Sequence, residues 1–259
     1  MIDNEMANGQ RPVAVVVGGS SGIGKATAQR FAVEGWQVVV AGIDAEKTIE
    51  TAAKLPGSNH LAMVMDVRLQ EDCERLMDQV EAKYDGANVL VNSTGISESH
   101  RAIDSDFDAW NRQLDVMLYG SVHLCRAMVP ILQDNGRIIQ ITSIHHERVA
   151  VGSSAYGMAK AALTQWIRSL ALELAPRGIL ANAIAPGFVR TPMSIKEDGT
   201  SELETEWFRD NYVRYGRLPL KRAAEPEEIA GAVWFLSGPD ATYITGSVVT
   251  VDGGLSITF

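Results

Sequence analysis

A tyrosine and a lysine four residues apart carry the clearest chemical signal in the sequence. Tyr156 and Lys160 fall in a stretch of helical composition, and residues four apart share one helix face. A free phenol has a pKa of about 10, and a neighbouring ammonium lowers that pKa because it favours the phenolate. Such a pair can exchange a proton near neutral pH, as general acid–base catalysis requires. The spacing alone is also compatible with a chance pair on an ordinary helix.

Ser143 and the residues after it extend this chemistry. Ser143 follows a buried strand predicted at 138–141, and open α/β sheets bind ligands at the carboxyl ends of their strands. Its hydroxyl can hydrogen-bond a substrate oxygen, although a serine in a turn is the alternative. His145, His146 and Arg148 come next, and imidazole and guanidinium groups suit a polyhydroxy or anionic ligand. We therefore predict substrate contacts from Ser143, His145 and Arg148, with a solvated polar loop as the alternative.

A glycine-rich turn lies between the first predicted strand and the first predicted helix. It reads Val17-Gly18-Gly19-Ser20-Ser21-Gly22-Ile23-Gly24. Glycines let the backbone approach a pyrophosphate closely, and a helix N-terminus offers free N–H groups and a favourable dipole. An unliganded tight turn is the alternative, but the position after the first strand of an α/β chain favours a dinucleotide.

Asp44 bears on which dinucleotide binds. It lies 20 residues after Gly24, near the end of the second predicted strand. An acidic residue there can hydrogen-bond the adenosine ribose and repel a 2′-phosphate, while capping of the next helix is the alternative. No Arg or Lys stands at Ser21, Gly42 or Ile43, where a 2′-phosphate would need a counter-charge. We expect NAD as the cofactor, with NADP left open.

The elements that must position these residues follow from the alternation of apolar runs and amphipathic stretches. Strands are predicted at 13–17, 38–41, 61–65, 89–91, 138–141, 180–184 and 247–251, and helices at 24–34, 46–55, 70–83, 108–132, 154–174 and 227–236. Such alternation implies parallel strands joined by right-handed crossovers. The expected fold is a single α/β domain with a Rossmann-type, doubly wound, seven-stranded parallel sheet. A flexible arm is expected at 1–11, the domain at 12–259, and a substrate-loop insert with short helices at 190–219.

Composition excludes several other classes of protein. The chain has 23 basic and 32 acidic residues, a net charge of −9, which argues against a nucleic-acid partner. No uncharged apolar stretch approaches ~18 residues, so no membrane span is expected. The N-terminus lacks a signal pattern, which favours a cytoplasmic protein. Cys73 and Cys125 stand far apart without neighbouring ligand types, so neither a disulfide nor a metal site is expected.

Taken together, these motifs resemble the short-chain dehydrogenase/reductase family over nearly the whole chain. Beyond the glycine turn, which departs only at Val17, the matches are Asp66-Val67, Asn92-Ser93-Thr94-Gly95, Ser143 thirteen residues before Tyr156, Asn182 to Pro186-Gly187, and Asp252-Gly253-Gly254. The resemblance implies cofactor contacts from Gly18, Ser20, Ser21, Gly22, Ile23, Gly24, Asp44, Asp66, Val67, Asn92, Gly95, Tyr156, Lys160, Pro186, Gly187, Val189 and Thr191.

The same resemblance implies a mechanism and an assembly. A hydride would pass between NAD(H) and the substrate carbon, with Tyr156 exchanging the hydroxyl proton, Ser143 orienting the oxygen and Lys160 holding the nicotinamide ribose. The chain is similar to members that oxidise aldoses and polyols, such as glucose 1-dehydrogenase-like enzymes. A carbonyl or 3-oxoacyl thioester reductase is the second reading, and a non-catalytic NAD(H)-binding scaffold the third. A homotetramer paired through the helices at 108–132 and 154–174 is expected.

Met117 departs from the family pattern. Most members carry an asparagine at this position, where it anchors a water that passes protons to the lysine. A thioether cannot donate a hydrogen bond and accepts only weakly. We expect Met117 to pack within a helix while the reaction persists, because Ser143, Tyr156 and Lys160 all remain. A slowed or rewired proton relay is the alternative.

Overall fold

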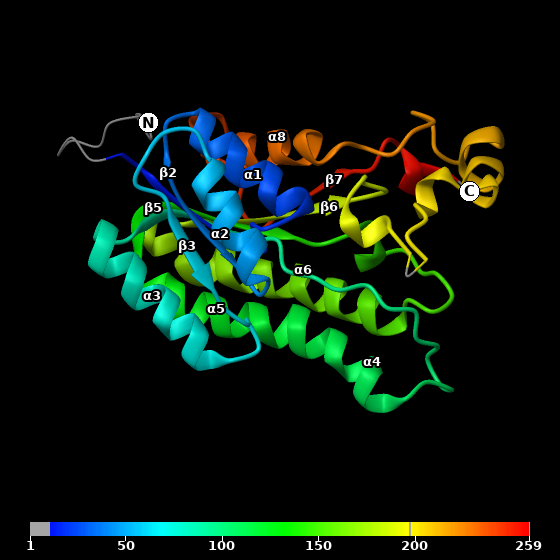
Figure 1. Cartoon of the computed structure of the whole chain (residues 1–259), viewed down its shortest axis with the longest axis horizontal. Helices are drawn as coiled ribbons and strands as arrows, with labels where there is room; N and C mark the ends of the chain where they lie inside the picture. The colour runs from blue at the N-terminus through cyan, green and yellow to red at the C-terminus, as the bar shows by residue number, and fades with distance from the viewer. Residues whose placement is uncertain (1–10, 197, 259) are drawn as a thin grey trace.

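The computed structural model describes residues 11–196 and 198–258. Its centre is a seven-stranded sheet, and every adjacent pair of strands is parallel (Figure 1). The strands are β1 (Val13–Val17), β2 (Gln37–Gly42), β3 (Leu61–Val64), β4 (Ala87–Asn92), β5 (Leu132–Ile141), β6 (Leu180–Pro186) and β7 (Val248–Val251). Their order is β3-β2-β1-β4-β5-β6-β7, so the winding reverses between β1 and β4. The predicted doubly wound α/β fold is confirmed.

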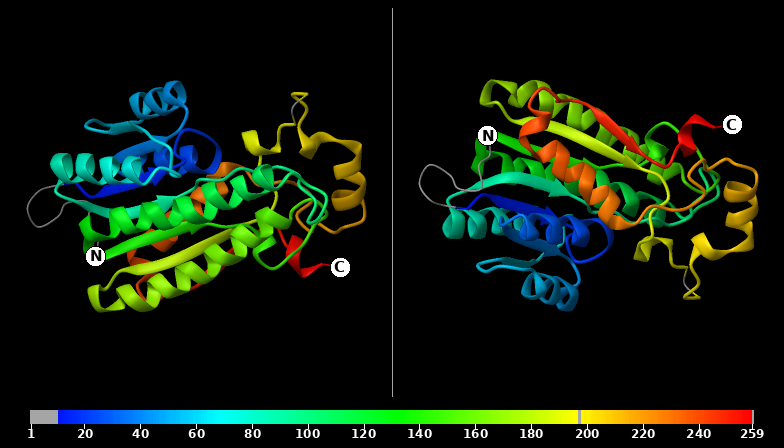
Figure 2. Two further views of the ribbon diagram at one scale, coloured as in Figure 1. Left: turned by 90° about the horizontal axis from the view of Figure 1, so that it is seen from below. Right: turned by 90° about the horizontal axis from the view of Figure 1, so that it is seen from above.

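Helices cover both faces of the sheet (Figures 1 and 2). The larger ones are α1 (Gly22–Val33), α2 (Ala45–Lys54), α3 (Gln70–Tyr84), α4 (Phe107–Leu114), α5 (Gly120–Met128), α6 (Ser154–Leu174) and α8 (Pro226–Ser237). One apolar core joins the sheet to α1, α2 and α8, and the other joins it to α3, α5 and α6. All five residues of β1 are buried, which explains its unbroken run of valine and alanine.

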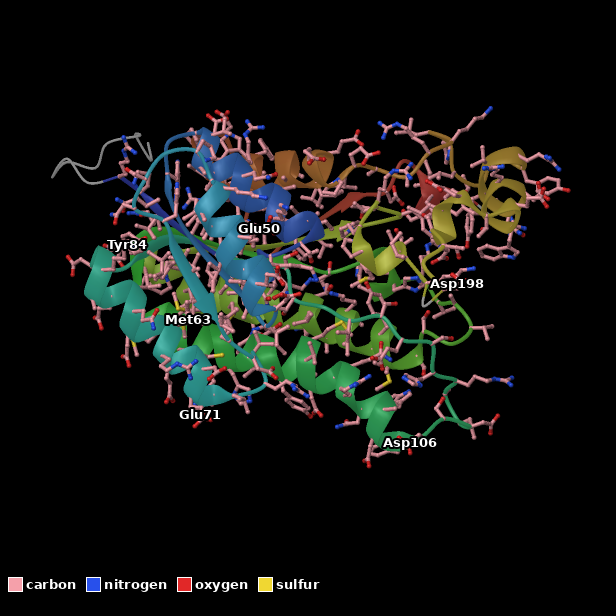
Figure 3. The ribbon with its side chains drawn as sticks, viewed as in Figure 1. Glu50, Met63, Glu71, Tyr84, Asp106 and Asp198 are labelled. Carbon is pink, nitrogen blue, oxygen red and sulfur yellow. The ribbon has the colours of Figure 1, made fainter. Side chains whose placement is uncertain are left out.

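Side chains divide according to these layers. Met63 of β3 is buried, whereas Glu50 of α2 and Glu71 of α3 are exposed (Figure 3). Cys73 of α3 and Cys125 of α5 are both buried as free thiols, and burial raises the pKa of each to about 12. Within the described ranges, no helix is both long and apolar enough to span a bilayer.

The prediction of one continuous helix at 108–132 is wrong, because the segment is interrupted and its last helix ends earlier than predicted. The chain forms α4, then a π-helical segment at Asp115–Tyr119, then α5, which ends at Met128. A short 3-10 turn containing Pro130 follows, and Leu132 already begins β5. Proline lacks the N–H that a longer helix needs, so the helix stops there. Strand β5 is correspondingly longer than the predicted 138–141.

The insert at 190–219 contains short helical segments, as its composition predicted. They lie at Pro192–Ser194, Glu202–Glu204, Glu206–Phe208 (α7) and Arg209–Arg214. The insert has a small apolar core of its own, built on Leu203, Phe208 and Leu218. It projects at one end of the molecule, with the C-terminal segment beside it (Figures 1 and 2). The flexible arm predicted at 1–11 lies outside the described residues except for Arg11, and the domain boundary stays a prediction.

Candidate active site

The predicted catalytic residues meet at the carboxyl edge of the sheet. Because all strands are parallel, the loops that follow β1, β4, β5 and β6 emerge at this one edge. Ser143 follows β5, whereas Tyr156 and Lys160 occupy the first two turns of α6. The Lys160 Nζ lies 5.4 Å from the centroid of the Tyr156 ring, and its ammonium donates to the Ile141 carbonyl at 3.1 Å. The helical spacing therefore brings phenol and ammonium together next to the end of β5.

Burial governs the protonation of this pair. Lys160 is only 3% exposed, and burial lowers its pKa to about 8. Burial is also the largest influence on Tyr156 and raises its pKa, while the Ser143 hydroxyl acts in the opposite direction. The predicted lowering by Lys160 is not the dominant effect, because an apolar environment disfavours both charged forms. A positively charged ligand bound nearby would lower the pKa of the Tyr156 phenol, because it favours the phenolate.

A pH-dependent change in stability should follow from the buried lysine. The folded state binds the Lys160 proton less tightly than the unfolded state, whose lysine has a pKa near 10.5. Unfolding free energy should therefore rise between about pH 8 and pH 10.5 by up to about 3 kcal/mol from this group. Urea unfolding of Lys160→Met measures the contribution as a difference, because other titrating groups cancel. A stability difference between the two proteins that stays constant from pH 7 to pH 10.5 would contradict it.

The glycine turn has the close packing that a phosphate site requires. Gly18 has a φ of +78°, and a Cβ on it would lie 2.7 Å from the Ser93 carbonyl. A Cβ on Gly24 would lie 2.0 Å from the Gly18 carbonyl oxygen. Helix α1 begins at Gly22, and the Ser21 side chain makes no capping hydrogen bond to described residues. The first N–H groups of α1 thus follow a turn whose glycines at 18, 19, 22 and 24 carry no side chain, which fits a pyrophosphate.

The loop after β6 completes this cradle. Pro186 ends β6, and the chain continues through Gly187 and Val189 to Thr191. A Cβ on Gly22 would lie 3.1 Å from the Thr191 methyl group, so the loop reaches the glycine turn across the sheet edge. The structure therefore brings Thr191 to the cradle, which contains the predicted Ser20 and Ile23 as well.

Asp44 realises the capping alternative. Its side chain accepts the Lys47 backbone N–H at 3.1 Å and the Lys47 ammonium at 2.6 Å, which lowers the pKa of the Asp44 carboxyl. Asp44 thereby caps α2 at the end of β2. The carboxylate keeps 39% of its side-chain surface exposed, so capping leaves room for a second hydrogen-bond partner.

The residues after β3 and β4 are held by local contacts. Asp66 pairs with Arg68, and Val67 is buried against Gly120. Asn92 donates to Ser121 Oγ at 2.7 Å and accepts the Thr94 N–H at 3.1 Å. Through these bonds Asn92 connects the end of β4 to Ser121 of α5 and to the loop at Thr94. Gly95 lies near the lysine, since a Cβ on it would come within 3.6 Å of the Lys160 Nζ.

His145 lies beside Tyr156, whereas the Arg148 side chain contacts Ser256. The His145 ring lies edge-on to Tyr156 at 5.6 Å, and its backbone N–H donates to Ser143 Oγ at 3.2 Å. Burial lowers the pKa of His145, so the imidazole is neutral at pH 7, and its buried Nδ1 has no hydrogen-bond partner within the described residues. Arg148 is exposed and donates to the Ser256 carbonyl. Sequence reasoning missed this contact.

Met117 packs within a helical segment, as expected, and borders Gly95 together with the lysine. It is fully buried in the π-helical segment, among Ala159 and Leu163. A Cβ on Gly95 would touch both the Met117 Sδ, at 3.8 Å, and the Lys160 Nζ. A thioether therefore lies near the ammonium.

Replacing Met117 with asparagine should leave the reaction intact. We expect Met117→Asn to change kcat by less than about tenfold, because Ser143, Tyr156 and Lys160 keep their positions. An amide in this apolar cluster should lower stability by about 1–3 kcal/mol where it lacks a partner. Steady-state kinetics and urea unfolding measure the two effects. A variant that folds normally yet is inactive would show that the thioether itself is required.

The sheet topology and the cluster of Ser143, Tyr156 and Lys160 define a dinucleotide-dependent oxidoreductase. A family model described as enoyl-(acyl carrier protein) reductase matches residues 17–256, and the chain belongs to the short-chain dehydrogenase/reductase family. This family uses NAD(P)(H) and acts on carbonyl or alcohol groups.

Reductases of acyl-carrier-protein thioesters and sugar dehydrogenases are among the relatives. The chain is 38% identical over 247 residues to a 3-oxoacyl-[acyl-carrier-protein] reductase from Mus musculus, covering 95% of this chain and 98% of the relative. It is 34% identical over 253 residues to a glucose 1-dehydrogenase from Gluconobacter oxydans, covering 94% and 91%. The aldohexose dehydrogenase structure from Thermoplasma acidophilum superposes with a TM-score of 0.82 at 29% identity, covering 96% and 95%.

Proposed function

We propose that the protein is an NAD(H)-dependent dehydrogenase of a sugar or polyol. The observation that carries this proposal is the grouping of Ser143, His145, Tyr156 and Lys160 at one sheet edge, beside the glycine turn. A neutral imidazole next to the catalytic phenol suits a substrate that has a second hydroxyl near its reacting carbon. The likeness to a glucose 1-dehydrogenase and an aldohexose dehydrogenase supports the same substrate class.

The residues of the cradle fit a dinucleotide. We propose that the turn at 18–24 holds the pyrophosphate, Asp44 the adenosine ribose, Asp66 and Val67 the adenine side, and Asn92, Gly95 and Lys160 the nicotinamide side. The loop with Pro186, Gly187, Val189 and Thr191 would border the carboxamide and phosphates. When bound, the nicotinamide supplies or accepts the hydride.

The proton is handled by the protein's own side chains. In oxidation, the Tyr156 phenolate accepts the proton of the substrate hydroxyl, and in reduction the phenol returns it. Ser143 donates to the substrate oxygen and keeps it within reach of Tyr156. Lys160 carries its charge next to the phenolate and is itself oriented by the Ile141 carbonyl. His145 contacts a second substrate oxygen. Arg148 as a third substrate contact stays a prediction.

A substrate panel tests the proposal. Purified protein is given NAD or NADP with aldoses, polyols and sugar acids, and in the reverse direction NADH or NADPH with 3-oxoacyl thioesters, while absorbance of the reduced cofactor is followed. Sugar oxidation with NAD supports the proposal. Turnover confined to NADPH and thioesters supports the second candidate, a 3-oxoacyl thioester reductase, which the match to the murine reductase favours. Tight cofactor binding without any turnover would support the non-catalytic scaffold.

Asp44 should set the preference for NAD over NADP. Asp44→Ser keeps a hydroxyl that can cap α2 but removes the negative charge that opposes a 2′-phosphate. We expect the ratio of kcat/KM for NAD over NADP to fall by about tenfold. Asp106→Ser is the matched control, because Asp106 caps α4 through the Ala109 N–H at 2.9 Å. An unchanged ratio in Asp44→Ser would remove Asp44 from the cofactor site.

We also propose a cytoplasmic homotetramer. The segments predicted to pair carry exposed apolar side chains, among them Tyr119 before α5 and Met158 and Leu172 on α6. Burial of such side chains against a second copy is a common route to symmetric oligomers. Light scattering coupled to gel filtration measures the mass of the assembly, and a monomer at micromolar concentration would contradict the proposal.

A further inference from the structure

The turn at residues 252–258, here called the C-terminal turn, links two segments that border the candidate site. On one side it meets the catalytic loop, residues 143–148, which begins with Ser143. Arg148 at the end of that loop is exposed, and its guanidinium donates to the Ser256 carbonyl across 108 residues of sequence. This bond joins the catalytic loop directly to the C-terminal turn.

The acceptor of that bond is held in place. The Asp252 carboxylate accepts the Gly254 N–H at 2.9 Å and the Ser256 N–H at 2.6 Å, so the turn closes on its own acidic side chain. Asp252 also packs against the loop that follows β6, because a Cβ on Gly187 would lie 2.8 Å from the Asp252 Cβ. The Ser256 carbonyl is therefore a fixed anchor for Arg148, since both ends of its segment are restrained.

On its other side the C-terminal turn holds the base of the insert. Leu255 packs against the apolar core formed by Leu203, Phe208 and Leu218. The Leu220 N–H donates to the Gly253 carbonyl at 3.2 Å, and the Thr258 hydroxyl donates to the Arg217 carbonyl at 2.6 Å. The insert therefore takes its position partly from the turn.

We propose that Arg148 is a positioning residue that ties the catalytic loop to the C-terminal turn and thereby fixes the insert relative to Ser143. Its guanidinium acts on the substrate site through the Ser256 carbonyl and Leu255. Loss of this bond frees the C-terminal turn from the catalytic loop, and the insert then samples more open positions. The proposal rests on the proposed function only where substrate kinetics are used.

Limited proteolysis tests the link without substrate or cofactor. The insert contains tryptic sites at Arg190, Lys196, Arg209, Arg214 and Arg217. We compare four proteins with the parent: Arg148→Ala, Arg148→Lys, a shortened chain that ends at Leu255, and a double variant that carries Arg148→Ala in the shortened chain. The first and third should be cleaved in the insert about fivefold faster than the parent protein, because local opening governs cleavage. Lysine at 148 should restore part of the protection, and the double variant should match the shortened chain.

Two controls separate positioning from general loss of structure. Arg101→Ala removes another exposed arginine, on the loop before α4, and should leave cleavage unchanged. Thermal unfolding of each variant shows whether the fold is retained. Should the shortened chain fail to fold, the comparison of Arg148→Ala with Arg148→Lys still decides the matter. Cleavage of folded Arg148→Ala at the parental rate would overturn the proposal.

Kinetics distinguish positioning from direct substrate binding. With the best sugar from the panel, Arg148→Ala should raise KM by about fivefold with little change in kcat. In a double-mutant cycle with the shortened chain, the two effects on KM should not add, because the shortened chain already lacks the Ser256 carbonyl that Arg148 binds. Additive effects, with proteolysis unchanged, would assign Arg148 to the substrate instead. If no sugar is turned over, the proposed function fails while proteolysis still tests the link.

Discussion

Tyr156→Phe should lower kcat by about 1,000-fold while leaving cofactor affinity within about twofold. The substitution removes only the hydroxyl, and the ring keeps its edge-on contact with His145 and its place above Lys160. Without that oxygen the site loses the group proposed to exchange the substrate proton. Steady-state kinetics with the best substrate, together with titration of NADH binding by fluorescence, measure the two quantities.

A neighbouring variant controls for disturbance of the helix. Met158→Leu lies in the same turn of α6 and keeps an apolar side chain of similar size at an exposed position, so activity should be retained. Parental activity in Tyr156→Phe would remove the phenol from the reaction. A combined loss of activity and cofactor affinity would instead indicate that the tyrosine supports the fold of the site, which contradicts the role proposed for it.

Two helical glycines should respond in opposite directions to the same substitution. In Gly24→Ala the new methyl group would lie 2.0 Å from the Gly18 carbonyl oxygen and 2.6 Å from its carbon, so backbone must move. We expect a loss of about 3 kcal/mol in unfolding free energy and at least about tenfold in cofactor affinity. Both effects arise because the glycine turn and α1 cannot keep their close approach.

The matched control is Gly231→Ala in α8. A Cβ there meets no described atom within 4 Å, and alanine is the better helix former. This variant should gain about 0.5–1 kcal/mol of stability with cofactor binding unchanged. Urea unfolding and NADH titration measure both proteins. Equal effects of the two substitutions would show that close packing at Gly24 has no special part in the cradle.

The fold was predictable because its signals are local. Runs such as 13–17 are apolar throughout, which is what a strand buried on both faces requires. The spacing of Tyr156 and Lys160 predicted their shared helix face for the same reason. The π-helical segment between α4 and α5 escaped prediction, because residues 115–119 contain no proline or glycine that would mark a change of helix type.

Three features of the site could be settled only by the structure. The bond from Arg148 to Ser256 joins residues 108 apart, and no local pattern marks either partner. The raised pKa of Tyr156 follows from burial, which composition cannot measure. Asp44 offered two readings in the sequence, and only coordinates show its side chain on the Lys47 N–H. The first two depend on tertiary contact or burial, whereas the Asp44 bond is local and competes with a second reading.

The two cysteines have a practical consequence. Thiol-specific reagents react with the thiolate form of cysteine. The thiols of Cys73 and Cys125 are both buried, and they stay protonated well beyond pH 8. Modification must therefore wait until the layer formed by α3 and α5 opens. The rate of labelling by a chromogenic disulfide reagent therefore measures how often that layer opens. Bound cofactor or substrate should slow the labelling, and the ligand that stabilises the native state more should slow it more.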